Sequence, residues 1–271
     1  MDNSPSLTDR VTIEIAEGVA EVSLNRPDKL NALDPAMFEA IIAAGERLSR
    51  TADLRAIVLT GAGKGFCAGL DKETFASFAT KSAPAMGDIT QRTHGIANAW
   101  QQATYVWRTL PFPVIAAIHG VALGGGFQIA LGADIRYVAP DARLAIMEIK
   151  WGIVPDMGGI ALMRELARSD VIRELAMTGR IFSGTEALAY GFATGLHADP
   201  LAAARSTAKE IAARSPDAVR ATKRLMNFTS DADAAAILLA ESKEQAALLG
   251  SPNQIEAVHA GMEGRPGRFA D

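Results

Sequence analysis

Cysteine is almost absent from the sequence, because the 271-residue chain contains a single one, Cys67. One cysteine cannot form an internal disulfide bond, which excludes the small secreted domains that depend on several disulfides. The opening residues, MDNSPSLTDR, also lack the basic start and the apolar core of a secretory signal peptide. Both absences predict a cytoplasmic protein.

Basic residues are not concentrated anywhere in the chain. The 27 Lys and Arg are outnumbered by 31 Asp and Glu, and the formal net charge is −4. Recognition of nucleic-acid phosphates needs a basic patch or stripe, so we expect no nucleic-acid partner. His94, His197 and His259 show no spacing to Cys67 or to carboxylates that would indicate a metal site.

Long uninterrupted apolar runs are also lacking. The longest candidate, residues 113–134, contains His119, Gln128 and several glycines, and Pro111 and Pro113 stand at its start. A membrane-spanning helix needs about 20 predominantly apolar residues. The interrupted pattern instead predicts a buried strand, a tight turn and a buried helix, with no membrane partner.

The composition that remains is that of a globular protein, with 49% hydrophobic and 21% charged residues. A strand, a glycine-rich loop and a helix follow one another at least twice: residues 56–60 run into GAGKGFCAGLD, and residues 113–118 run toward the glycine triplet 124–126. From about residue 200 the pattern is helical and rich in alanine. We therefore expect an α/β protein with a core domain over residues 1–199 and a C-terminal helical region over residues 200–271.

Local signals predict individual elements within this frame. Residues 11–15 and 19–24 alternate like a β-hairpin, and residues 31–50 form a helical pattern with Asp34 as its N-cap. Residues 86–110 are predicted to be mainly helical. Three serines also stand where a helix N-cap is expected: Ser183, Ser215 and Ser251.

The two glycine-rich loops do not match the common phosphate-binding motifs. A P-loop requires Gly-Lys followed by Ser or Thr, whereas Gly65 follows Lys64. Phe66 and Ile129 stand where the dinucleotide fingerprint requires its third glycine. Two interpretations remain from the residues alone. Either the bare main chain lets a ligand dock on backbone N–H groups as an oxyanion hole, or the glycines only permit tight packing.

Five segments in order resemble the crotonase, or enoyl-CoA hydratase/isomerase, superfamily: NRPDKLNAL, GKGFCAGLD, HGVALGGGFQIALGADIRY, MEIKWGIVPDMGG and TGRIFSGTEALAYGFA. The resemblance covers almost the whole chain. It implies a spiral of ββα units with a C-terminal α-helical region that builds trimers, often paired into hexamers. It also implies an acyl-coenzyme A thioester as the substrate, with coenzyme A part of the substrate and no separate cofactor.

The same resemblance assigns site residues. The backbone N–H groups of Leu70 and Gly125 are expected to hold the thioester oxygen. Trp151 either walls the acyl pocket or fills core, and Phe269 either approaches coenzyme A from a neighbouring subunit or belongs to a frayed tail. The residues expected to line the coenzyme A channel are Arg26, Lys29, Ala32, Ala68, Asp71 and Lys72.

Crotonase hydratases carry two glutamates, and this chain keeps only one of them. Glu148 occupies one position, and Gln128, which cannot exchange a proton near neutral pH, occupies the other. Asp156 stands where dienoyl-CoA isomerases have an acid that pairs with the glutamate. With the thioester oxygen held, we expect Glu148 to take a proton and Glu148 or Asp156 to return it at another carbon, while Gln128 orients the substrate or a water.

This pattern favours double-bond isomerisation of an enoyl- or dienoyl-CoA. The alternative is an enoyl-CoA hydratase of fatty-acid β-oxidation that uses Glu148 with a water bound by Gln128. Other chemistry of the superfamily, including thioester hydrolysis, is a further possibility. A protein of another class, a noncatalytic acyl-CoA or RNA binder, would also lack the carboxylate at position 128.

Overall fold

The computed structural model describes residues 9–79 and 88–271. Residues 1–8, which carry most of the opening segment judged for a signal peptide, lie outside the described residues. A six-stranded sheet forms the base of the protein, in the order β1-β2-β3-β4-β6-β9. Its strands are β1 (Val11–Ala16), β2 (Val19–Leu24), β3 (Ala56–Gly61), β4 (Val114–Ile118), β6 (Ile135–Val138) and β9 (Gly195–Leu196).

The predicted hairpin is confirmed as β1 and β2, which pair antiparallel around Glu17 and Gly18. Both turn residues have positive φ angles, 52° and 74°, as a tight two-residue hairpin requires. The remaining pairs in this sheet are parallel. Because parallel strands start and end together, the loops after β3 and β4 leave the sheet at the same edge.

A second, three-stranded sheet contains β5 (Val121–Leu123), β7 (Arg143–Ala145) and β8 (Phe182–Ser183). Consecutive strands divide between the two sheets and a helix follows each pair: β4, β5 and α4 (Gly125–Leu131), then β6, β7 and α5 (Gly159–Leu166). This repeat is the predicted spiral of ββα units. It places residues 113–134 in β4, β5 and α4, which confirms the strand, turn and helix expected there.

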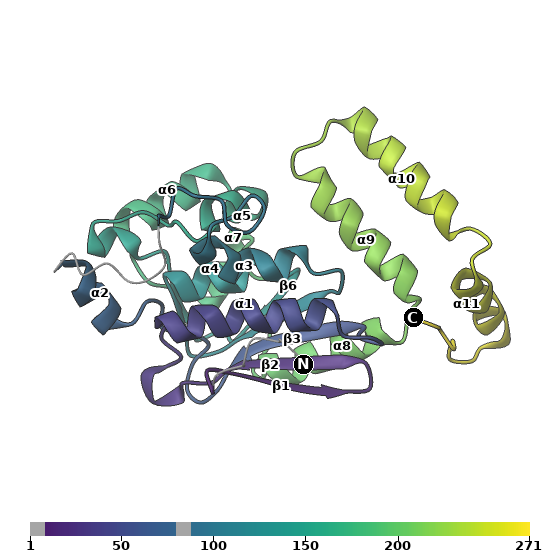
Figure 1. Ribbon diagram of the computed structural model, residues 1–271, viewed down its shortest axis with the longest axis horizontal. Helices are drawn as coiled ribbons and strands as arrows, with labels where there is room; N and C mark the ends of the chain where they lie inside the picture. The colour runs from purple at the N-terminus through teal and green to yellow at the C-terminus, as the bar shows by residue number, and fades with distance from the viewer. Residues whose placement is uncertain (1–8, 80–87) are drawn as a thin grey trace.

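Helices cover both faces of the six-stranded sheet (Figure 1). On one face lie α1 (Pro35–Ser49) and α3 (Ala99–Thr109), with α4 against α3. Asp34 caps α1 as predicted, accepting a hydrogen bond from Met37 N at 2.8 Å. On the other face lies α8 (Pro200–Ala212), whose Ala204 and Ala208 are fully buried against β3 and β4. Small side chains let this helix approach the sheet closely.

The other described helices are α2 (Lys72–Ala79), α6 (Ser169–Thr178), α7 (Gly184–Tyr190), α9 (Pro216–Thr229), α10 (Ala234–Leu248) and α11 (Pro252–Glu263), with 3₁₀ turns η1 (Pro27–Lys29) and η2 (Glu148–Trp151). Ser183 and Ser251 cap helices through their side chains, as predicted, whereas Ser215 stands at the N-cap without a side-chain bond. The helix expected over residues 86–110 begins only at Ala99. The prediction is therefore wrong for residues 88–98, which form turns and irregular structure.

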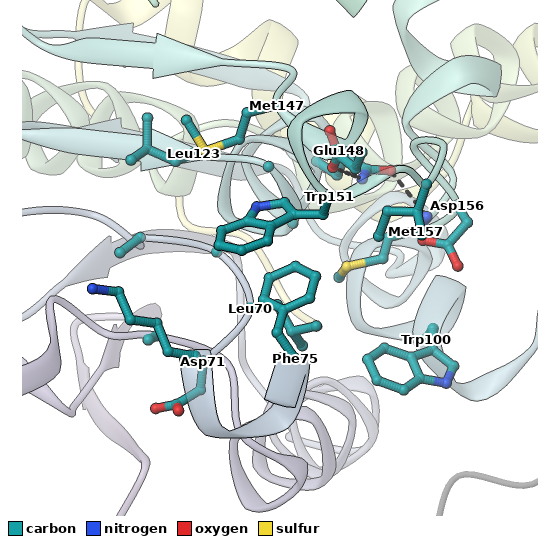
Figure 2. A pocket seen from close by; sticks show the side chains of 18 of the residues that line it. Leu70, Asp71, Phe75, Trp100, Leu123, Met147, Glu148, Trp151, Asp156 and Met157 are labelled. Carbon is teal, nitrogen blue, oxygen red and sulfur yellow. Dashed lines mark hydrogen bonds between the residues drawn. The ribbon is translucent and has the colours of Figure 1, made fainter. Parts of the chain in front are cut away.

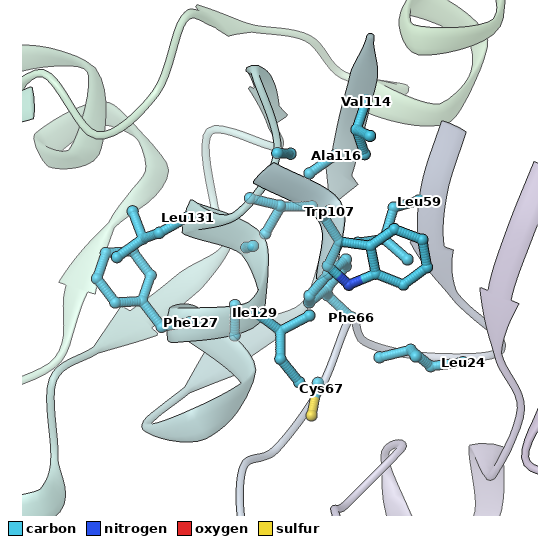
Figure 3. Packing of buried hydrophobic residues seen from close by; sticks show 14 of the residues in the cluster. Leu24, Leu59, Phe66, Cys67, Trp107, Val114, Ala116, Phe127, Ile129 and Leu131 are labelled. Atoms are coloured by element: carbon cyan, nitrogen blue, oxygen red, sulfur yellow. The ribbon is translucent and has the colours of Figure 1, made fainter. Parts of the chain in front are cut away.

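A single large apolar cluster fills the space between the six-stranded sheet and the helices α1, α3 and α4. Figure 3 shows Trp107 of α3 at its centre, beside Phe66 and Cys67 from the loop after β3. The Cys67 thiol is fully buried, and burial raises its pKa to about 12. This cysteine is therefore a packing residue rather than a nucleophile.

Helices α9, α10 and α11 extend away from this body as an arm, whereas α8 packs on the sheet (Figure 1). The division of the chain at residue 200 stays a prediction. The arm exposes many large apolar side chains, including Met226, Leu238, Leu239 and Met262. No described helix is long and apolar enough to cross a membrane.

One buried lysine joins the arm to the body. Lys223 of α9 is 6% exposed. Its ammonium donates hydrogen bonds to Trp107 O at 3.1 Å, to Phe112 O at 2.9 Å and to Asp134 Oδ2 at 2.7 Å. Burial lowers the pKa of Lys223, and the Asp134 charge opposes that shift. The lysine therefore holds together α9, the end of α3 and the start of β6.

We predict that Lys223→Met lowers the free energy of unfolding by about 2 to 4 kcal/mol, because two buried carbonyls lose their lysine donor and the Asp134 carboxylate keeps only the Val114 N–H in place of its cation. Urea denaturation measures the change. Lys209→Met is the matched control, since it removes the exposed Lys209–Glu17 ion pair and is expected to change stability by less than about 1 kcal/mol. Equal effects of the two substitutions would contradict this assignment.

Candidate active site

A cavity of about 1180 Å³ lies between the two glycine-rich loops, α2 and η2. Most of the residues assigned from the sequence line this one cavity: Lys29, Ala32, Ala68, Leu70, Asp71, Lys72, Gly125, Gln128, Glu148, Trp151 and Asp156. Arg26 and Phe269 do not line it. Segments that are far apart in the sequence therefore meet at a single site.

The glycine loops meet because their main chains touch. Leu123 N donates to Cys67 O at 3.0 Å, and Cys67 forms a parallel bridge with Ala122. A Cβ atom built on Gly126 would lie 2.4 Å from Cys67 O, and one built on Gly69 would lie 2.5 Å from Leu123 O. Contacts this short exclude any side chain, so both glycines are required for the approach of the loops. Tight packing is thus part of the role of these glycines.

Two backbone N–H groups remain available where the loops meet. Gly125 is the first residue of α4, so its N–H has no acceptor within the helix. In the described parts of the chain the Leu70 N–H makes no hydrogen bond, although its neighbours Gly69 and Asp71 both bond to Leu33. A Cβ atom on Gly69 would lie 3.6 Å from Gly125 N, which places the two loops within reach of one ligand atom. The packing interpretation and the oxyanion-hole interpretation are therefore compatible.

Glu148 begins the turn η2 and is 7% exposed. Its Oε1 accepts a hydrogen bond from Gln128 Nε2 at 2.6 Å, and its Oε2 is buried without a partner among the described residues. Burial raises the pKa of Glu148, and the nearby charge of Asp156 raises it further, while the Gln128 hydrogen bond opposes the shift. The side chain is therefore a carboxylate with increased basicity and one free oxygen.

Asp156 also lines the cavity and, like Glu148, has a raised pKa (Figure 2). The residue is exposed at the surface through the cavity, yet protein atoms surround its carboxyl closely enough that desolvation raises its pKa. Two carboxyl groups in one cavity, each with a raised pKa, form a proton donor and acceptor pair when they hold one proton between them.

Gln128 is buried at the cavity and makes three hydrogen bonds. Its Oε1 accepts hydrogen bonds from Met157 N and Gly159 N, both at 2.9 Å, and its Nε2 donates to Glu148. The amide oxygen has no lone pair left for a water or a substrate hydroxyl group. The amide nitrogen has a second N–H beside the one that bonds Glu148, so the expectation that Gln128 orients the substrate or a water stays a prediction.

Arg26 differs from its expected place. Its Nη1 bonds Asp71 Oδ2 at 2.5 Å and Ala32 O at 3.2 Å, and lies 3.6 Å from Asp34. Burial acts to raise the pKa of Asp71, but hydrogen bonds from Glu73 N and Arg26 lower it below its usual value. Arg26 therefore binds two residues of the cavity lining, Ala32 and Asp71, but does not itself line the cavity. Lys29 and Lys72 are the basic residues that line it.

Two aromatic side chains form one wall of the cavity, and the sequence indicated only one of them, Trp151. Phe75 of α2 and Trp151 of η2 stack with ring centroids 4.4 Å apart and planes at 19°. Figure 2 shows this pair in the middle of the cavity, with Trp100 and Met157 on the side of Asp156. Trp151 is 52% exposed, so it belongs to the cavity and not to the core. Phe75 and Trp100 carry no motif or spacing that would have identified them beforehand.

The C-terminal tail is not frayed. Ala270 N bonds Asn253 Oδ1 at 3.0 Å, and Asp271 accepts from Asp53 N at 2.8 Å. Phe269 thus lies near the start of β3, away from the cavity of its own chain. Its approach to a neighbouring subunit stays a prediction. Among the described residues, no group of three His, Cys, Asp or Glu side chains could hold a metal ion.

The family profile described as enoyl-CoA hydratase/isomerase matches residues 14–271. The chain belongs to this family. It is 32% identical over 252 residues to the mitochondrial Delta(3,5)-Delta(2,4)-dienoyl-CoA isomerase of Homo sapiens. This alignment covers 91% of this chain and 77% of that protein. It is 34% identical over 218 residues to the (E)-benzylidenesuccinyl-CoA hydratase of Thauera aromatica, covering 79% of this chain and 80% of that protein.

Solved structures support the same family. The crystal structure of enoyl-CoA hydratase from Bacillus anthracis superposes with a TM-score of 0.86 at 29% identity, covering 96% of this chain and 98% of that chain. The recognition as a crotonase-superfamily enzyme, and the fold expected from it, are therefore confirmed. Trimer formation stays a prediction.

We predict that Gly126→Ala lowers the free energy of unfolding by about 1 to 3 kcal/mol, because the added methyl group drives α4 away from Cys67 O. Chemical denaturation measures it. Gly261→Ala is the matched control: that position lies in α11 with nothing within 4 Å of the added methyl group, and we expect a gain of about 0.5 to 1 kcal/mol. Similar losses in both variants would contradict the close approach of the loops.

Proposed function

We propose that this enzyme isomerises the double bonds of a dienoyl-CoA thioester. The observation that carries the proposal is the presence of Glu148 and Asp156 in one cavity, both with raised pKa values, beside two available backbone donors. A shift of conjugated double bonds needs a base at one carbon and an acid at a distant carbon. The relatives named as Delta(3,5)-Delta(2,4)-dienoyl-CoA isomerases support this substrate class.

The Leu70 and Gly125 N–H groups would bind the thioester oxygen. Donors aimed at an oxygen that gains charge stabilise the transition state, and loss of one such donor costs about 10² to 10³ in rate. Glu148 lies next to this point, since its Oε1 is 3.5 Å from where a Cβ atom of Gly124 would lie. C2 of the substrate is bonded to the thioester carbon, so we place C2 beside Glu148.

In the proposed reaction Glu148 removes a proton from C2 of a 3,5-dienoyl thioester. The electron pair of the broken C2–H bond delocalises onto the thioester oxygen and along the diene. Asp156 in its protonated form then gives a proton to C6, the far end of the conjugated system, and the double bonds move to positions 2 and 4. One C–H bond breaks and one forms. A proton then passes from Glu148 to Asp156, directly or through solvent, and restores the starting state.

Hydration is the second candidate, supported by the relative named as a hydratase. Addition of water needs a group that accepts a proton from the water. Gln128 cannot serve, because its amide oxygen is occupied by Met157 N and Gly159 N. Glu148 alone would have to deprotonate the water and protonate the substrate. The contacts of Gln128 therefore favour isomerisation.

The remaining parts of the proposal concern the rest of the molecule. Lys29 and Lys72 would contact phosphate groups of coenzyme A from the cavity lining. The exposed apolar side chains of the arm support assembly into a trimer or a hexamer. We propose a cytoplasmic location, and a role in fatty-acid metabolism, on the sequence arguments alone.

We predict that Glu148→Gln and Asp156→Asn each lower kcat for a 3,5-dienoyl-CoA by about 10² to 10⁴, with smaller changes in KM, because each removes one proton-transfer group but preserves its shape. The appearance of the conjugated 2,4-diene in the ultraviolet measures the rate. Crotonyl-CoA is the control substrate for hydration. Rapid hydration of crotonyl-CoA without turnover of any dienoyl-CoA would overturn the proposal.

The rate of proton removal is predicted to fall as the pH drops through the raised pKa of Glu148, so its midpoint lies above 4.5, the ordinary value for glutamate. Exchange of the C2 protons of butyryl-CoA in D₂O, followed by mass spectrometry, isolates this step because butyryl-CoA cannot isomerise. In the proposed reaction Asp156 is protonated, and therefore neutral, when Glu148 takes up a proton, so Asp156→Asn is expected to leave this midpoint unchanged. A midpoint that moves to lower pH would show that Asp156 is charged at that point and would contradict the proposed location of the proton.

A further inference from the structure

The amide of Gln128 has only one possible orientation. Its Oε1 faces two backbone N–H groups, Met157 N and Gly159 N, which can only donate. Its Nε2 must therefore point at Glu148, 2.6 Å from Oε1. The side chain is 1% exposed, so solvent does not compete for these bonds. One buried amide thus links α4, the turn η2 and the start of α5.

The first consequence concerns charge. A donor fixed on a carboxyl oxygen stabilises the ionised form of that carboxyl. Gln128 acts in this way on Glu148. The groups around the Glu148 carboxyl are the amide of Gln128 on α4, the backbone at Gly124, the backbone N–H groups of Met147 and Glu148, and Asp156 on the segment before α5; Asp156 is the titratable one. When these two acids hold one proton between them, the Gln128 bond favours its location on Asp156.

The second consequence concerns geometry. Met157 follows Asp156 directly, so the bonds from Met157 N and Gly159 N to Gln128 hold the segment that carries the second acid. A Cβ atom on Gly159 would lie 2.6 Å from Gln128 Oε1, so position 159 has to be glycine for this contact. The same amide leaves Oε2 of Glu148 buried and without a hydrogen-bond partner in residues 9–79 and 88–271. That oxygen is the one available to the substrate.

We infer that Gln128 is a positioning residue that assigns the two acids their roles. It stabilises the ionised form of Glu148, the base, and it anchors the segment that carries Asp156, the acid. Gln128 acts through these groups and does not itself exchange a proton. The assignment rests on the proposed function for the role of Asp156, whereas the effect on Glu148 can be measured without it.

The test compares two substitutions at position 128 in the full-length enzyme. Gln128→Met has similar size but removes the donor and the acceptor. Gln128→Glu preserves the acceptor for both N–H groups, and in its protonated form it also donates to Glu148. The measurement is the pH dependence of C2 proton exchange in butyryl-CoA, with isomerisation of a 3,5-dienoyl-CoA recorded in parallel.

The acid limb is the part of the pH–rate profile in which the exchange rate falls as the pH drops. We expect the acid limb of Gln128→Met to move to higher pH by about one to two units, since loss of a hydrogen bond to the charged carboxylate raises the pKa of Glu148. Its maximal rate is expected to fall by about 10²-fold, with a smaller change in KM, because the acids lose their placement. Gln128→Glu should show an acid limb at or below that of the wild type, because two adjacent carboxyls that share one proton resist taking up a second.

Lys223→Met is the matched control, since Lys223 is also a buried side chain that bridges backbone groups and a carboxylate, but far from the cavity. It should lower stability without moving the acid limb. An unmoved limb in Gln128→Met, or equal upward shifts in both position-128 variants, would overturn the inference. Exchange that is absent from the wild type, or that survives in Glu148→Gln, would overturn it too.

The two proposals fail differently. If the wild type exchanges C2 protons and the limbs move as expected, but no dienoyl-CoA is isomerised, the proposed function fails while the effect of Gln128 on Glu148 stands. If dienoyl-CoA is isomerised and the limbs do not move, the function stands and the inference about Gln128 fails.

Discussion

The close approach of two main-chain segments determines the rest of the site. The loop after β3 and the turn before α4 touch through backbone atoms, with Leu123 N bonded to Cys67 O and with glycines at 69 and 126 where a side chain would collide. Parallel pairing of β3 and β4 brings both segments to the same edge of the sheet. Burial of Phe66 and Cys67 in the main core holds the first loop from beneath. The N–H groups of Leu70 and Gly125 are therefore placed by packing, before any ligand arrives.

A side-chain hydrogen-bond network, and not main-chain packing, positions the two acids Glu148 and Asp156. Glu148 and Asp156 lie eight positions apart on an irregular segment between β7 and α5, where regular secondary structure does not define side-chain positions. The buried amide of Gln128 supplies that definition. It belongs to α4, the same helix whose first N–H group faces the thioester oxygen in our proposal. One short helix thus controls both the electrophilic and the basic parts of the site.

Much of this arrangement was predictable from the sequence, and the failures have physical causes. Hairpin, strand and cap signals near Glu17, Asp34 and Ser183 are local, and the structure confirms them. The helix predicted from residue 86 begins only after Asn98, because a periodic pattern does not define where a helix starts. The side chain of Asp88 forms a turn with Thr90, and Asn98 begins the helix only later through a capping box with Gln101.

The family motifs identified most residues of the candidate site, but they did not predict which residues these side chains contact. Arg26 was expected in the coenzyme A channel from the family resemblance, whereas the carboxylates of Asp71 and Asp34 hold its guanidinium behind the cavity wall. Phe75 reaches the cavity only because α2 packs toward η2. The bonds of Gln128 to Met157 N and Gly159 N join residues about thirty positions apart. No short-range pattern reports such contacts, because they depend on the path of the whole chain.

The backbone N–H groups of Met157 and Gly159, which bind the Gln128 oxygen, affect which residues position 128 can accept. Both an amide oxygen and a carboxylate oxygen can accept hydrogen bonds from them, so the backbone can accommodate either glutamine or glutamate at the position. In the proposed function, exchange of glutamine for glutamate at this position would add a third acid to the site by altering one group of one side chain, with the scaffold left as it was.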